Sequence, residues 1–87
     1  MAVIWIPSQL REVTGGLETV TVEAETVRQA VERLEERFPG IRGRLCEGDR
    51  LRQNLSLVVD GMISRKQLRE HLTASSEVHF LPAISGG

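Results

Sequence analysis

The sequence predicts an α+β domain in which one long helix packs on a mixed sheet of four or five strands. The chain has 87 residues, enough for a single modest hydrophobic core. Several short segments favour strands, and one long segment carries apolar residues at helical spacing. Such a helix has one apolar stripe to bury, and a sheet with one apolar face is its natural partner.

Two strands joined by a turn are expected at the start of the chain. The apolar segment 2–6 contains Val, Ile and Trp and ends at Pro7, which favours a strand. In residues 18–24, two valines alternate with Thr and Glu, which is the period of a strand buried on one face. The turn signal Gly15–Gly16 lies between the two segments, so we expect a hairpin.

The long helix is expected between Thr26 and Phe38. Its apolar residues fall on one stripe and its charged residues on the other face. Thr26, followed three residues later by Gln29, predicts a capping box at the start, and Pro39–Gly40 ends the helix. The stripe consists of Val27, Ala30, Val31, Leu34 and Phe38.

The middle of the chain is expected to hold a loop and a second hairpin. Residues 41–54 are rich in Arg and Gly and predict a short helical turn followed by a mobile loop, with Leu45 and Leu51 as buried anchors. A strand over 55–59, a tight Asp-Gly turn and a returning strand then predict a hairpin over 55–63.

The last third of the chain completes the expected topology. Residues 65–72 predict a short helix with Leu68 and Leu72 inward, and residues 78–81 predict a final strand that Pro82 ends. If the first and last strands lie side by side in the middle of the sheet, the fold is a β-grasp, or ubiquitin-like, fold. A split βαβ arrangement of the ferredoxin type needs a second helix as long as the first, and the sequence shows none.

Composition and charge exclude several classes of function. Eleven basic and twelve acidic side chains argue against a nucleic-acid partner gathered by bulk positive charge. The single cysteine, Cys46, allows neither an internal disulfide nor a four-cysteine metal site. No apolar run approaches the ~20 residues of a membrane span, and the N-terminus lacks the plan of a signal peptide. We therefore expect a cytoplasmic protein without a membrane partner.

Side-chain chemistry does not point to a self-sufficient enzyme. Cys46 is far in sequence from both histidines, His71 and His79, and we expect it to be a small buried apolar residue. Gly15–Gly16 is followed by neither a lysine nor a helix, so it is not a phosphate-binding loop. No metal site and no bound cofactor are expected.

The C-terminal segment is the one part of the chain whose residues point to chemistry. We expect one domain over residues 1–87 with a flexible tail over about 82–87. A terminal glycine pair is often only a frayed end. Here, however, Pro82 would set the direction of a tail whose six residues can extend about 20 Å. Gly86 and Gly87 lack a Cβ atom, so they can enter a narrow channel and present the main-chain carboxylate.

The chain resembles the MoaD/ThiS family of ubiquitin-like sulfur carriers. The matching parts are the ending Leu-Pro-Ala-Ile-Ser-Gly-Gly over 81–87, the Thr26–Val27 opening of the helix and the hairpin 55–63. The segment 6–11 and the following Thr-Gly-Gly are similar to the CysO-like branch, which supplies sulfur for cysteine synthesis. Two turns depart from the family pattern. Residues 74–77 replace a Gly-Asp-Glu type of turn, and Asp-Gly stands where Asn-Gly is frequent.

The resemblance implies a sulfur carrier rather than an enzyme. Gly87 would be adenylated by a ubiquitin-activating-like adenylyltransferase that uses ATP and magnesium, and then converted to a thiocarboxylate. Gly86, Ser85 and Ile84 would enter the active sites of the partners, which hold the catalytic groups. The sulfur acceptor would be a cysteine synthase-like enzyme or the large subunit of molybdopterin synthase. The alternatives are the small subunit of molybdopterin synthase, a protein modifier joined to lysines through Gly87, and a plain binding module.

Strand alternation also predicts a docking surface. If Ile4 and Phe80 point toward the helix, then Trp5, His79 and Leu81 point outward. Trp5, Leu81 and His79 would then form an apolar patch beside the tail and serve as a candidate site for partners. The alternative is that Trp5, the only tryptophan, belongs to the core.

Overall fold

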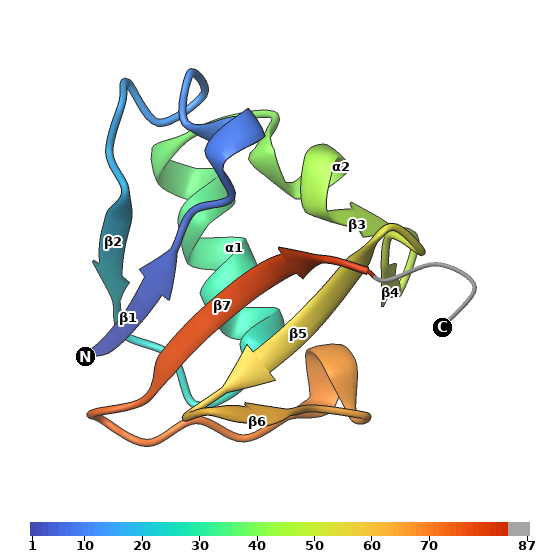
Figure 1. Ribbon diagram of the computed structural model, residues 1–87. Coiled ribbons are helices and arrows are strands. Elements are labelled where there is room, and N and C mark those ends of the chain that lie inside the picture. The colour runs from blue at the N-terminus through green and yellow to red at the C-terminus, as the bar shows by residue number, and fades with distance from the viewer. Residues whose placement is uncertain (84–87) are drawn as a thin grey trace.

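The main sheet has five strands in the order β2-β1-β7-β5-β6 (Figure 1). The computed structural model describes residues 1–83, and the expectations for Ile84, Ser85, Gly86 and Gly87 lie outside the described residues. The strands are β1 (Ala2–Trp5), β2 (Thr19–Val22), β5 (Leu55–Val59), β6 (Met62–Ile63) and β7 (Glu77–Pro82).

The first and last of these strands are neighbours at the centre of the sheet. β1 runs parallel to β7, with Ile4 opposite Val78, and every other pair in the sheet is antiparallel. The hairpin β1–β2 therefore lies on one side of β7, and the hairpin β5–β6 lies on the other (Figure 1). This is the β-grasp, or ubiquitin-like, fold, and it confirms the mixed sheet and the central strand pair that the sequence predicts.

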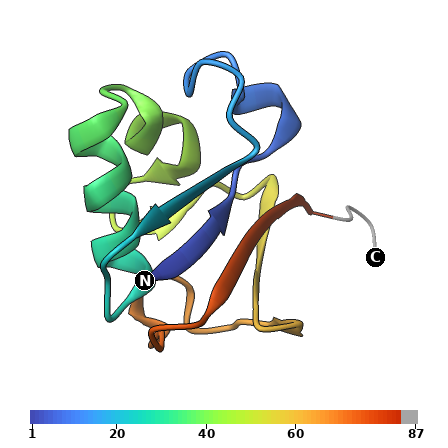
Figure 2. The ribbon, with the colours of Figure 1, turned by 90° about the vertical axis from the view of Figure 1, so that its left-hand side faces the viewer.

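One face of the sheet is covered by the helix α1 (Val27–Arg37), as Figure 2 shows from the side. Four residues of the predicted stripe are fully buried, whereas Phe38 caps the C-terminal end and is only half-buried. The Thr26 hydroxyl accepts the Gln29 N–H, as a capping box requires. The Gln29 side chain instead accepts the N–H of Glu25, one residue before the expected donor.

Segment 41–54 is more ordered than the sequence predicts. It contains the short helix α2 (Ile41–Leu45), and then β3 (Cys46–Glu47) pairs with β4 (Arg50–Leu51) where a mobile loop was expected. Gly48, at φ +65°, makes the turn possible, and the Arg52 N–H donates to the Leu45 carbonyl. Leu45 and Leu51 are buried anchors, as predicted.

The segment before β7 is a 3-10 turn over Gln67–Arg69 rather than a longer helix over 65–72. Gln67 has a φ of +54°, which an α-helix does not tolerate. Leu68 and Leu72 nevertheless point inward, as expected, and both belong to the core. A second 3-10 turn, Ser8–Leu10, follows β1 and was not predicted. Within residues 1–83, no helix combines the length and the apolar character needed to cross a membrane.

Candidate functional site

The face of the sheet opposite α1 carries a row of side chains across four strands. Trp5 lies opposite His79, His79 lies opposite Val58, and Val58 lies opposite Ile63. All four lie on the outer face because the residues beside them in β1, β5 and β7 are buried against α1. Leu81 follows two residues after His79 on the same face and is 45% exposed. We call Trp5, Val58, Ile63, His79 and Leu81 the outer patch.

Trp5 belongs to the surface and not to the core. Its ring stacks on the His79 imidazole with a centroid distance of 5.1 Å and an interplanar angle of 11°. The indole Nε1–H donates to Glu77 Oε1 at 3.1 Å. Stacking holds the indole against the His79 imidazole, and the hydrogen bond fixes its orientation. The aromatic face is therefore preorganised, which favours binding because less side-chain entropy is lost.

The structure brings together the three patch residues that the sequence singles out. Trp5, His79 and Leu81 line one hollow of about 220 Å³, and Pro7 and Pro82 lie on its wall. The sequence reasoning missed Val58 and Ile63. The signal for both was present, because Leu57 and Val59 point inward and an Asp-Gly turn at 60–61 sets Val58 opposite Ile63. Ile63 is 75% exposed and is the most open apolar group of the patch.

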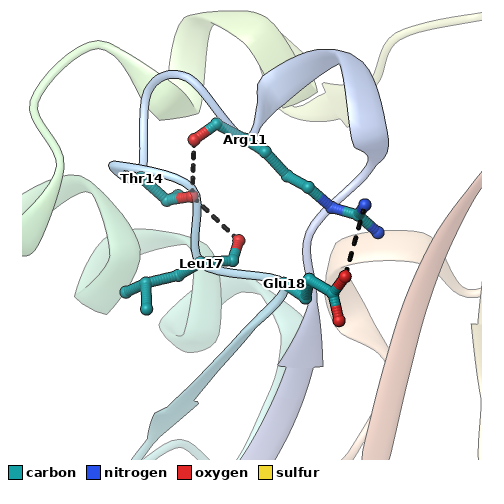
Figure 3. A network of polar contacts seen from close by, with 4 residues as sticks. All are labelled: Arg11, Thr14, Leu17 and Glu18. Carbon is teal, nitrogen blue, oxygen red and sulfur yellow. Dashed lines mark hydrogen bonds and ion pairs between the residues drawn. The ribbon is translucent and has the colours of Figure 1, made fainter.

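The loop that follows β1 forms part of the wall of this hollow. Within the loop, the buried Thr14 hydroxyl donates to the carbonyls of Arg11 and Leu17, each at 3.0 Å (Figure 3). The guanidinium of Arg11 lies 3.7 Å from the Glu18 carboxylate. Gly15 and Gly16 adopt positive φ values of +69° and +91°, so the predicted glycine turn is confirmed. These contacts lie within the loop and fix its shape.

The base of the predicted tail is hydrogen-bonded to the sheet. β7 continues through Pro82, where a strand end was expected, and the Ala83 N–H donates to the Asn54 carbonyl at 2.8 Å. N–H groups alternate sides along a strand, so the position of Pro82 faces away from β5. On that side the pairing with β1 has already ended, opposite His79. The missing N–H of Pro82 therefore removes no hydrogen bond between strands.

The remaining candidates for side-chain chemistry lie apart from this face. Cys46 is a free thiol, 3% exposed, on the β3–β4 hairpin, as expected of a small buried residue. Burial raises the pKa of the Cys46 thiol against the opposing effect of Arg42, Arg28 and Arg52. His71 is exposed and forms a bridge with Thr26. Among residues 1–83, no three His, Cys, Asp or Glu side chains are grouped as a metal site.

A β-grasp domain whose central strand leads into the C-terminal segment, beside an open apolar face, has the architecture of a ubiquitin-like carrier. The chain belongs to the ThiS family, whose model matches residues 4–87. The sequence-based assignment to the ThiS and MoaD type of sulfur carrier is thereby confirmed.

Solved structures agree with this family. A chain of the Amycolatopsis orientalis BexX/CysO complex is 28% identical with a TM-score of 0.90, over 100% of both chains. Mycobacterium tuberculosis CysO is 26% identical with a TM-score of 0.88, over 97% of this chain and 100% of that one. SAMP1 from Haloferax volcanii is 27% identical with a TM-score of 0.76, over 99% and 98% of the two chains. No curated protein sequence matches the chain.

Proposed function

We propose that this sulfur carrier bears its sulfur as a thiocarboxylate on Gly87 and donates it in the synthesis of cysteine or a related product. The observation that carries the proposal is the similarity to CysO, which extends over nearly the whole chain and includes the loop after β1. The position of β7 supports it as well, because the central strand of the sheet leads directly to the terminal residues.

The chemistry follows from the leaving group. A carboxylate resists attack because oxide would have to leave. A ubiquitin-activating-like adenylyltransferase, with ATP and magnesium, joins the Gly87 carboxylate oxygen to the α-phosphorus of ATP and releases pyrophosphate. A sulfide or persulfide sulfur then attacks the acyl carbon and AMP leaves with the oxygen. A persulfide donor must be cleaved at its S–S bond by a second thiol, which becomes part of a disulfide.

The folded domain contributes a place to dock. Four residues follow Ala83, and they span at most about 14 Å when extended. An active site that receives Gly87 must therefore bring its surroundings against the surface around Ala83. The outer patch lies there, since Leu81 and Pro82 line the same hollow as Trp5. In this proposal the catalytic groups belong to the partners, and the acceptor is a cysteine synthase-like enzyme.

One alternative has an observation of its own. The similarity to SAMP1 supports a protein modifier, in which Gly87 forms an isopeptide bond with a lysine of a target. Both functions begin with the same acyl adenylate and differ only in the nucleophile, sulfur or an amine. Lys66 is the only lysine of the chain and is exposed, so it is the one internal side chain to which a second copy could be joined.

Intact-mass spectrometry of the chain isolated from its host tests the proposal. A carrier shows a population heavier by one oxygen-to-sulfur exchange, and fragmentation places the sulfur on Gly87. Deleting Gly87, or adding one residue after it, abolishes this population while the melting temperature stays unchanged. A wild-type chain that never gains sulfur in the presence of its adenylating enzyme contradicts the proposal. Gly-Gly remnants on lysines of other proteins indicate the modifier instead.

A further inference from the structure

The charges of the chain are strongly segregated although they nearly cancel. The net charge of the whole chain is −1, with eleven cations and twelve carboxylates. Residues 41–69 contain seven of the cations and only three of the carboxylates. The rest of the chain contains four cations and nine carboxylates. The α2, β3–β4 and 3-10 segments that lie between α1 and β7 in sequence are thus basic, and the remainder is acidic.

Within residues 1–83, five cationic side chains of the basic segment form no hydrogen bond or ion pair. Six of the eleven cationic side chains form a hydrogen bond or an ion pair with a neighbour. The other five make no such contact within residues 1–83, and all five are exposed. We call these five the cationic band: Arg44, Arg50, Arg65, Lys66 and Arg69.

The fold gathers the cationic band on one surface. Arg50, Arg65, Lys66 and Arg69 line a groove of about 410 Å³ between β4, the 3-10 turn and the start of α1. Its one carboxylate, Asp49, lies 3.6 Å from Arg28 and is the partner of that side chain. These side chains come from segments about fifteen residues apart in sequence, so only the tertiary structure brings them together.

The cationic band begins beside the point where the described chain ends. Arg44 and Arg52 line a hollow of about 300 Å³ together with Asn54. The Asn54 carbonyl accepts the N–H of Ala83. Arg52 is two residues from Arg50 and one from Leu51, whose N–H donates to the Gln67 side chain. Basic side chains therefore lie along the route from Asn54, beside Ala83, through β4 to the 3-10 turn.

We propose that the cationic band docks on an acidic surface of the adenylating partner, an inference that rests on the proposed carrier function. The four residues after Ala83 force that partner to lie close to the domain, and the cationic band is the charged surface that starts there. A nucleic-acid ligand is disfavoured because nine carboxylates on the rest of the chain repel phosphate at long range. The outer patch supplies contact area, and the cationic band supplies attraction before contact.

Steady-state adenylation with a matched pair of charge variants tests this inference. The test variant is Arg50→Glu with Arg65→Glu. The control is Arg33→Glu with Arg37→Glu, which makes the same change in net charge. Arg33 donates to the Glu23 carbonyl just after β2, and Arg37 donates to the Thr21 carbonyl in β2, which is an edge strand of the sheet. Pyrophosphate release is measured with the adenylating enzyme of the same host, at about 50 mM and about 500 mM salt. Melting temperatures confirm that both variants fold.

The expected result is a rise of about tenfold in the apparent KM of the test variant at low salt, with kcat unchanged. The difference from wild type shrinks at high salt, and the control stays within about twofold of wild type. Equal KM values for test and control overturn the inference, whether both equal wild type or both rise together. If wild type is not adenylated at all, it is the proposed carrier function that fails.

A binding assay separates the nucleic-acid reading. Fluorescence anisotropy with labelled single-stranded DNA and RNA is measured for wild type and the test variant. The inference expects no saturable binding at physiological salt. Salt-dependent binding by wild type that the test variant loses, with its adenylation KM unchanged, overturns the inference in favour of a nucleic-acid surface.

Discussion

The Asp60 side chain connects the β5–β6 hairpin to the start of β7, and its replacement tests how that connection stabilises the fold. Asp60 Oδ2 accepts the Ser76 hydroxyl and Oδ1 accepts the Glu77 N–H, each at 2.9 Å. Ser76 is almost completely buried. Asp60 itself lies in the left-handed region at φ +52°, followed by Gly61 at φ +82°, the signs of a type I′ turn. The side chain and the backbone each contribute, and three variants separate them.

The expected magnitudes follow from these contacts. Each hydrogen bond to the partly exposed carboxylate is worth about 1 kcal/mol of unfolding free energy. A residue with a Cβ atom pays about 1 kcal/mol in the left-handed region unless its side chain compensates locally. Asp60→Ala therefore destabilises by about 3 kcal/mol, and Asp60→Gly by about 2 kcal/mol because the backbone cost is removed. Asp60→Asn keeps an acceptor and tolerates the left-handed conformation, so it costs about 1 kcal/mol.

Urea unfolding and thermal unfolding, each followed by circular dichroism, measure these differences. Each 1 kcal/mol corresponds to a shift of about 4–8 °C in Tm for a domain of this size. Asp60→Gly as stable as wild type would show that the carboxylate contributes nothing. Asp60→Gly less stable than Asp60→Ala would show that the turn carries no backbone strain. The adenylation rate below the Tm is expected to be unchanged. Asp60 contacts the first residue of β7, whereas Ala83 follows the last residue of that strand.

Two further predictions concern α2 and the outer patch. The N–H groups of Gly40 and Arg42 donate to the Glu35 carboxylate and lower its pKa. The lowered pKa adds stability above the unfolded Glu pKa of about 4.3, and this is lost as the pH falls through the folded pKa. Glu35→Gln is therefore expected to have a lower Tm than wild type at neutral pH and the same Tm in strong acid, and a constant gap would refute this. Trp5→Ala is expected to raise the adenylation KM at least tenfold. Leu17→Ala, also exposed but outside the outer patch, leaves KM unchanged, and equal effects would refute a docking role.

Elements with a clear local period could be predicted from the sequence. The strand pattern around Val20, the stripe of α1 and the Asp-Gly turn each specify structure through neighbouring residues. The β3–β4 hairpin could not be predicted in this way. Its strands have two residues each, too short for a period, and it depends on distant side chains. Glu35 holds the start of α2, and the Gln67 amide oxygen accepts the Leu51 N–H.

In the candidate site, too, the sequence predicted what depends on neighbouring residues and missed what depends on tertiary contacts. Alternation along single strands placed Trp5, His79 and Leu81 outward, whereas the extension of the patch to Ile63 required the register between strands. The cationic band was invisible because bulk charge is close to zero and its members are scattered in sequence. The two turns that depart from the family pattern also meet only in the fold, where Asp60 accepts hydrogen bonds from Ser76 and Glu77.

Because β1 pairs with β7, the five-stranded sheet can form only after the C-terminal strand has been synthesised. β7 pairs with β1 on one side and with β5 on the other. Until β7 has left the ribosome, no strand therefore connects the two hairpins into one sheet. A chain truncated before Glu77 lacks the strand that joins the two hairpins into one sheet. Because the residues that would bear sulfur are synthesised directly after this strand, they are offered to an enzyme only by a molecule whose sheet is able to close. Under the proposed function, a chain truncated before β7 would therefore consume neither ATP nor sulfide.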